Sequence, residues 1–242
     1  MNQITSVLTV VERPEYLNTQ IDCIKNQSIN SDIFIVWRNK QLYDLKYPAI
    51  LYLNESSHFN SLYGRFYNSL HIKTPYVFIC DDDLLPGKKY LERCIEFSKS
   101  KNDKVVISSY GMKFKEGEKK YTVSKRINHN TFLKVPTKVD IGGQGWFMKT
   151  ELLKLFTSYP YLLDDSGEDI HFSFCLFKNS IDIFVLDKDI DNKDTWQDTC
   201  RGSRGNDEKA QWKNTTHKIV RDKLIDKYTS LGWKFNINKS FL

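Results

Sequence analysis

The stretch "YVFICDDDLLPG" (residues 76–87) runs an uncharged, β-branched and aromatic segment directly into three consecutive carboxylates and then a Pro-Gly pair. The apolar run predicts a strand over 75–80 that is buried on both faces, and Pro86 predicts the start of a helix that continues to residue 100. The carboxylates of residues 81–83 repel one another unless a positive charge lies among them or water screens them. This end of the strand is therefore where we look for a cation or a ligand.

Strands and helices alternate on the N-terminal side of this stretch. Apolar, β-branched runs predict strands over 4–11, 31–37 and 47–53, and the helical spacing of apolar residues predicts helices after Pro14 and over 60–72. Alternation of this kind implies crossover connections, a mostly parallel central sheet and helices on both of its faces. We therefore predict an α/β fold in which ligands bind at the carboxyl ends of the strands.

The second half of the chain is less regular. A strand is predicted over 104–111, a hairpin around Glu116-Gly117, and a glycine-rich strand over 142–148 that leads into a short helix. The segment 170–176 alternates like a strand, but it follows acidic residues typical of a helix start, and we predict a helix. A long final helix is expected to end at Gly232.

Composition narrows the class of protein. The 242 residues are 40% hydrophobic and 14% aromatic, which is enough for a packed core. Five scattered cysteines without a CxxC pair argue against a disulfide framework and a zinc site. The formal charge of +6 is dispersed and favours an anionic ligand without indicating nucleic acid. No run approaches the ~20 apolar residues of a membrane span, and no signal peptide is evident, so we expect a soluble, cytoplasmic protein.

A divalent cation such as Mg²⁺ or Mn²⁺ would neutralise the acidic turn. Such an ion is held by one or two carboxylates, and water and phosphate oxygens complete its shell. The alternative is an acidic turn in which one aspartate caps the helix predicted at Pro86. The position of the triplet at the end of a buried strand favours the metal.

Several stretches resemble a known family, and they occur in the same order. The stretches "IVWRN" (35–39), "NSLYGRF" (60–66) and "IKTPYVFICDDDLLP" (72–86) are similar to exostosin-like glycosyltransferases, which are nucleotide-sugar-dependent enzymes of the GT-A fold. In that fold a DxD motif ends a central strand and holds a metal that bridges the diphosphate of the donor. Downstream, "GEDIHFSF" (167–174) resembles the Glu-Asp segment that these enzymes place beside the acceptor.

The resemblance implies one glycosyltransferase domain over 1–242, because no linker or repeat divides the chain. Residues 1–110 would bind the nucleotide-sugar, which we expect to be UDP-linked, and residues 111–242 would bind a glycan or glycoprotein acceptor. The absence of a recognisable anchor favours a bacterial or virus-encoded pathway over a Golgi enzyme.

The resemblance also assigns residues of the donor site. Asp83 would be the principal metal ligand, and Asp81 would assist it or face the sugar hydroxyls. The alternatives are ordinary, with Arg13 as a surface residue at a helix start and Arg65 as the partner of a structural carboxylate. The residues expected to hold the nucleotide-sugar are Thr9, Val11, Arg13, Asn60, Arg65, Asp81 and Asp82.

Transfer to a hydroxyl with inversion needs a carboxylate that removes the acceptor proton. Asp169 is our candidate, with Glu168 orienting it or holding an acceptor hydroxyl. Asp164 and Asp165 lie close enough in sequence to take the role instead. The alternative is that Glu168 and Asp169 only cap a helix. The resemblance leaves open whether configuration is inverted or retained.

Three further features have a functional and a plain interpretation. Gly143 and Trp146 either contact a sugar or form a bulge and part of the core. Arg201 and Arg204 either belong to a lid that neutralises the diphosphate or to a solvated loop. We expect His217, on the final helix, to be a surface residue.

Two other classes of protein share parts of this pattern. A nucleotidyltransferase also uses Mg²⁺ and paired aspartates, but "TVVERPEYLN" (9–18) lacks the Gly-rich loop that such an enzyme has after its first strand. A non-catalytic carbohydrate-binding module with a structural Ca²⁺ would need more oxygen ligands than the triplet offers. We therefore predict a metal-dependent glycosyltransferase of the hexosyltransferase type.

Overall fold

The structure of the protein is a computed structural model. It describes residues 3–10, 13–37, 50–53, 63–114, 120–121, 124–128, 131–162, 167–189, 191–192, 194 and 215–235.

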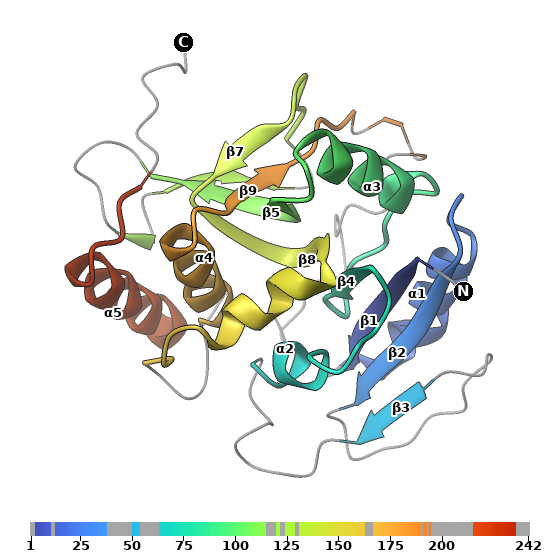
Figure 1. Ribbon diagram of the computed structural model, residues 1–242, viewed down its shortest axis with the longest axis horizontal. Helices are drawn as coiled ribbons and strands as arrows, with labels where there is room; N and C mark the ends of the chain where they lie inside the picture. The colour runs from blue at the N-terminus through green and yellow to red at the C-terminus, as the bar shows by residue number, and fades with distance from the viewer. Residues whose placement is uncertain are drawn as a thin grey trace.

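The described strands form one nine-stranded sheet, and its first half is parallel (Figure 1). The central strand β1 pairs in parallel with β2 on one side and with β4 on the other, and β3 extends the sheet beyond β2. Parallel neighbours need crossover connections, as the alternation of strands and helices predicted. These four strands are β1 (Ile4–Val10), β2 (Ser31–Trp37), β3 (Ile50–Leu53) and β4 (Tyr76–Cys80).

The second half of the sheet brings in antiparallel pairs. β8 lies between β4 and β5 and is antiparallel to both, whereas β9 pairs in parallel with β5. The short β6 and β7 pair antiparallel with β5 and β9. The prediction of an α/β fold is confirmed. The strands of this half are β5 (Val105–Lys113), β6 (Lys125–Ile127), β7 (Thr137–Val139), β8 (Ile141–Lys149) and β9 (Asp182–Val185).

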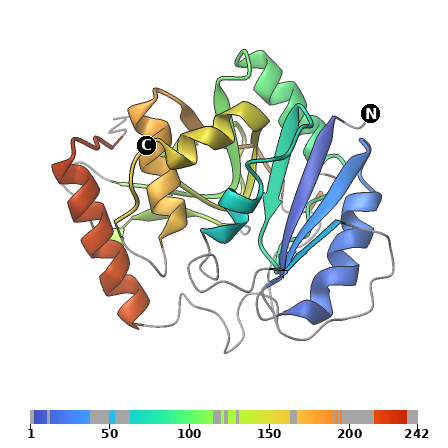
Figure 2. The same ribbon diagram turned by 60° about the horizontal axis from the view of Figure 1, so that its bottom comes forward.

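Helices cover both faces of the sheet (Figures 1 and 2). The helices α1 and α3 pack on one face, and α2, the 3-10 helix η3 and α4 pack on the other, with α5 outside α4. Two hydrophobic clusters, one on each side of the sheet, form the core. The helices are η1 (Pro14–Tyr16), α1 (Leu17–Lys25), α2 (Gly64–Asn68), α3 (Tyr90–Ser100), η3 (Thr150–Thr157), α4 (Glu168–Lys178) and α5 (Thr215–Ser230).

Coverage on both faces explains the apolar runs of the central strands. In β4, Phe78 and Cys80 join the cluster under α1 and α3, while Val77 and Ile79 join the cluster under α2 and α4. Successive side chains of a strand point to opposite faces, so a strand buried on both sides is apolar throughout.

Most elements lie where the sequence predicts them. The ambiguous segment 170–176 is helical in α4, and the final helix ends at Ser230 just before Gly232, whose φ is +90°. The residues at the tip of the predicted hairpin, Glu116 and Gly117, lie outside the described residues. Among the described helices, none has the length and apolar character required to cross a bilayer.

The predicted helix start at Pro86 is wrong, because α3 begins only at Tyr90. Side chains in and just after α1 bind the intervening backbone: the Cys23 thiol donates to the Pro86 carbonyl at 2.8 Å, and Nε2 of Gln27, two residues beyond α1, donates to the Gly87 carbonyl at 2.8 Å. These carbonyls anchor the segment to α1 before the helix starts. The proline therefore closes the acidic turn and does not open the helix.

Candidate active site

The carboxyl ends of β1 and β4 meet in a buried ion pair. Arg13, which follows β1, lies with Nη1 2.9 Å from Oδ1 of Asp82, which follows β4. Both residues are less than 10% exposed. The two strands are parallel neighbours, so their carboxyl ends lie at the same edge of the sheet. The two segments that the sequence assigns to the nucleotide-sugar site are therefore in direct contact.

Asp81 is fixed by its backbone and neutralised through its side chain. Its N–H donates to the Gln144 carbonyl of β8 at 2.9 Å, and its own carbonyl accepts from Gln20 Nε2 of α1 at 2.6 Å. Its carboxylate pairs with Nη1 of Arg65. Guanidinium groups therefore supply positive charge to the aspartate triplet, Arg13 at Asp82 and Arg65 at Asp81.

Arg65 also reaches the second acidic segment. Its Nη2 lies 2.9 Å from Oε1 of Glu168, the first residue of α4, and its side chain is only 4% exposed. One buried cation from α2 thus joins the turn after β4 to the start of α4. Because two nitrogens of a single guanidinium make these contacts, lysine could not reproduce them.

Asp169 pairs with a residue from the far end of the chain. Its Oδ2 contacts Nη2 of Arg221 on α5, and the Arg221 guanidinium lies 4.5 Å from the centre of the Tyr121 ring. Burial acts to lower the pKa of Arg221, but Asp169, Tyr121 and Glu168 outweigh it and the pKa is raised. Arg221 is therefore a permanent cation of this site.

Glu168 and Asp169 differ in their surroundings. Burial, and then the charge of Asp169, raise the pKa of Glu168 above its ordinary value, while Arg65 opposes them. Glu168 is 4% exposed, whereas the side chain of Asp169 is 13% exposed. The two adjacent carboxylates therefore face different cations, Arg65 on the side of β4 and Arg221 on the side of α5.

Sequence reasoning missed Arg221. It lies on a stripe of α5 whose other members, Leu224, Ile225 and Tyr228, are all fully buried. A charge on the apolar stripe of a helix is unusual, and this is the signal that would have found it.

His217 is not the plain surface residue that we expected. Its Nε2 lies 3.3 Å from Nη1 of Arg221, one turn along α5. Burial and the neighbouring guanidinium lower the pKa of His217 to about 4. The imidazole is therefore neutral near pH 7 and borders the site.

Gly143 lies near Asp169, and its predicted contact with a sugar stays a prediction. A Cβ added to it would lie 4.0 Å from Oδ2 of Asp169 and 3.1 Å from the Tyr110 ring. Gly143 itself is buried, and its backbone packs between the Tyr110 ring and the Asp169 carboxylate.

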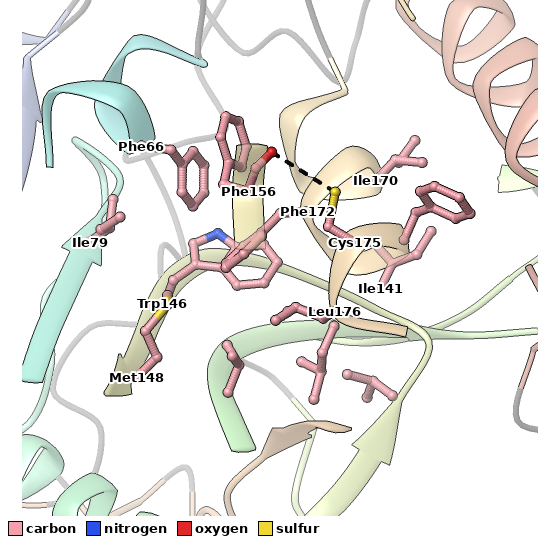
Figure 3. Packing of buried hydrophobic residues seen from close by; sticks show 14 of the residues in the cluster. Phe66, Ile79, Ile141, Trp146, Met148, Phe156, Ile170, Phe172, Cys175 and Leu176 are labelled. Carbon is pink, nitrogen blue, oxygen red and sulfur yellow. Dashed lines mark hydrogen bonds between the residues drawn. The ribbon is translucent and has the colours of Figure 1, made fainter. Parts of the chain in front are cut away.

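Trp146, by contrast, belongs to the core, and its predicted contact with a sugar is wrong (Figure 3). It is fully buried, and its ring packs edge-on against Phe66 and at a tilt against Phe172. The alternation of β8 directs this side chain under α2 and α4 and away from the carboxyl end of β4. Neither face of the indole is free.

The remaining predicted residues divide into two groups. Thr9 is buried at the end of β1, and its hydroxyl forms no hydrogen bond within the described part of the chain, while Asp83 is half-buried in the same turn as Asp82. The candidates that lie outside the described residues are Val11, Asn60, Asp164, Asp165, Arg201 and Arg204.

The acidic turn fits a small hard cation only as part of a shared site. Among the described residues, no three His, Cys, Asp or Glu side chains are arranged to hold a metal by themselves. Mg²⁺ and Mn²⁺ need only one or two carboxylates when a phosphate supplies further oxygens. In this turn Asp82 is paired with Arg13 and Asp81 with Arg65, and Asp83 is the third carboxylate.

The chain matches one protein family over almost its whole length. The family description "Glycosyl transferase family 64 domain" matches residues 4–232. No curated protein sequence matches the chain.

Solved structures show the same fold. S. aureus TarS matches with a TM-score of 0.54 and 15% identity over 77% of this chain, and S. aureus TarS 1-349 in complex with UDP-GlcNAc matches with 0.55 and 15% over 77%. The matched region is 35% and 56% of those two chains, so this chain spans only part of the proteins it resembles.

Proposed function

The chain belongs to the glycosyltransferase family 64 domains, and from this premise we propose that it transfers a sugar from a UDP-linked donor to a hydroxyl of a glycan or glycoprotein. One observation carries the proposal. Three buried arginines pair with four carboxylates, and these ion pairs connect the ends of β1 and β4 with the start of α4. Membership in a glycosyltransferase family leaves no need for the nucleotidyltransferase or the binding module.

The donor end of this set of ion pairs is the acidic turn with Arg13 and Arg65. Guanidinium groups bind phosphate oxygens through paired hydrogen bonds, and both arginines already lie among carboxylates that a diphosphate would join or replace. The complex of a TarS structure with UDP-GlcNAc supports UDP as the nucleotide, because that protein has the same fold. We assign residues 1–110 to this donor half.

We propose that Asp83 and Asp81 hold Mn²⁺ or Mg²⁺ together with the diphosphate. When bound, such an ion stabilises the negative charge that develops on the leaving diphosphate. Arg65 is paired with Asp81, so Asp81 would have to release this guanidinium if it were to hold the ion.

The acceptor end is the start of α4, in the half 111–242. We propose that Asp169, whose side chain is 13% exposed and lies near Gly143, takes the proton of the acceptor hydroxyl if the configuration inverts. Glu168 orients the site from the other side through Arg65. Arg221 holds the Asp169 carboxylate and balances its charge before the proton arrives. Arg201 and Arg204 remain predicted contacts of the diphosphate.

Calorimetric titration with UDP tests the donor site. Wild type and Asp83→Asn are titrated with Mn²⁺ and with EDTA, and Asp226→Asn, an exposed position on α5, is the matched control. We expect binding that requires Mn²⁺, is lost in Asp83→Asn and persists in the control. If binding is found, UDP-sugars are screened for hydrolysis and transfer. Absence of binding to UDP and to a panel of GDP, dTDP and CMP would overturn the proposal.

A further inference from the structure

The helix α5 presents one buried stripe to α4. Arg221, Leu224, Ile225 and Tyr228 recur at the spacing of a single helix face, and each is less than 5% exposed. Arg221 and Tyr228 are seven residues apart, which is two turns or about 10.5 Å along the axis. The position of the Arg221 guanidinium therefore depends on the contacts that fix the rotation of α5 about its own axis and its register along α4.

Leu224, in the middle of this stripe, packs against Gly167, the residue immediately before α4. Gly167 has a φ of +98°, and a Cβ added to it would overlap the side chain of Leu224. Glycine is thus required twice at this position, for the backbone conformation and for the close approach of α5. This contact sets the spacing between the helices but not the rotation of α5 about its axis, because an apolar contact has no direction.

Tyr228 makes a directional contact that fixes the rotation of α5 about its axis. Its hydroxyl lies 2.7 Å from Nδ1 of His171, and Nε2 of the same imidazole lies 2.8 Å from the Phe156 carbonyl. A carbonyl can only accept, so Nε2 carries the hydrogen, and Nδ1 of the neutral ring accepts the hydrogen of Tyr228. Burial lowers the pKa of His171, which keeps the ring neutral and preserves this pattern.

The three contacts form a single arrangement. α4 binds α5 through Asp169 to Arg221, through Gly167 to Leu224, and through His171 to Tyr228, and η3 orients the imidazole from behind. We propose that His171 and Tyr228 are positioning residues of the transferase, whose hydrogen bond turns α5 so that Arg221 meets Asp169. Only the expected effect on turnover rests on the proposed function. The role of the hydrogen bond in orienting α5 does not depend on it.

The role of the hydrogen bond in orienting α5 is tested without any substrate. Hydrogen exchange is followed by mass spectrometry in wild type, Tyr228→Phe and His171→Gln, which remove the same hydrogen bond from opposite ends. The glutamine retains a donor toward the Phe156 carbonyl. We expect exchange over 216–225 to rise several-fold in both variants, while exchange in β1 and β4 is unchanged. An unchanged α5, or a uniform rise over the whole chain, would overturn the inference.

Tyr76→Phe is the matched control. Tyr76 is also buried, and its hydroxyl makes a 3.0 Å hydrogen bond, to Asp103 away from the carboxyl ends of the strands. Tyr76→Phe removes a tyrosine hydroxyl and one hydrogen bond, as Tyr228→Phe does, but this hydrogen bond has no connection to α5. We expect it to leave exchange over 216–225 as in wild type.

The effect on turnover is tested by a double-mutant cycle. If the hydroxyl acts through Arg221, Tyr228→Phe lowers kcat about tenfold without changing UDP affinity, and it adds almost nothing in an Arg221→Lys background. Multiplicative losses in the double variant would overturn the inference, as would a change in UDP affinity alone. Should wild type show no transfer, the proposed function fails, while the exchange result still decides whether the bond positions α5.

Discussion

Arg65 and Glu168 lie 2.9 Å apart although 103 residues separate them in the chain. Their ion pair joins the turn after β4 to the start of α4, and Arg65 contacts Asp81 at the same time. A single buried guanidinium thus belongs to both halves of the candidate active site. Substitutions at this point should affect folding and donor binding together.

Arg65→Met should destabilise the protein strongly. It leaves Glu168 buried beside Asp169 without a cation, and breaking a buried pair on one side costs roughly 3–5 kcal/mol. Urea unfolding of wild type and variant measures the loss. Arg126→Met, at an exposed position of β6, is the control and should change the free energy of unfolding by less than about 0.5 kcal/mol. A small effect of Arg65→Met would contradict the burial of this ion pair.

Glu168→Gln should change how stability depends on pH. Because burial raises the pKa of Glu168 in the folded state, the folded protein binds a proton there more readily than the unfolded chain. The contribution of Glu168 is therefore most favourable below its ordinary pKa of 4.5 and is lost as pH rises through the folded value. Unfolding measured from pH 4 to 8 should show a smaller decline for Glu168→Gln than for wild type. Glu151→Gln, which is exposed on η3, should follow wild type.

His217→Gln should make the protein more resistant to acid. The folded pKa of about 4 lies below the ordinary 6.5, so the unfolded chain takes up the proton first and stability falls as pH drops from 6.5 toward 4. After a discount for partial exposure, this loss is on the order of 1 kcal/mol. Thermal unfolding at pH 7 and pH 5 measures it. Ser230→Ala, at an exposed position of α5 without a titratable side chain, should leave the pH dependence as it is, and an equal effect in both variants would refute the assignment.

Trp146→Ala should lower stability without acting on acceptor affinity. The indole is fully buried against Phe66 and Phe172, and truncation of such a side chain costs about 3–5 kcal/mol. Trp146→Phe keeps much of the volume and should cost less. Once transfer is measurable, the KM for acceptor should stay within about twofold in Trp146→Phe. A large rise in KM at unchanged stability would restore the sugar contact that the sequence suggested.

The sequence predicts the position of the acidic turn and of Arg13 because local patterns determine them. A strand buried on both faces must be apolar, so its end is visible where Asp81 begins, and parallel neighbours bring Arg13 to the same edge. The predicted beginning of α3 is wrong because Cys23 of α1 and Gln27, just beyond it, bind the backbone carbonyls of Pro86 and Gly87, and long-range hydrogen bonds leave no local signal.

The contacts of Asp169 and Trp146 are harder to predict. Arg221 reaches Asp169 only because α5 packs on α4 in one rotation, which depends on Gly167 and Tyr228 and not on the residues around Arg221. Trp146 could not be assigned from its glycine neighbours, since glycines allow a strand to approach a ligand or a second strand alike. Its burial follows from the face of β8 that α2 and α4 happen to cover.

The pairing of β4 with β8 has a consequence for how the chain is made. β4 ends at Cys80, but its antiparallel partner begins only at Ile141, so a growing chain exposes the edge of β4 long before β8 leaves the ribosome. An apolar strand with an unpaired edge invites association with other chains. The acidic turn and Lys73 flank this strand with charge at both ends. Charged residues that flank an apolar strand oppose its aggregation, and here they do so while the partner strand is still missing. The charges that serve the finished site thus also protect the unfinished protein.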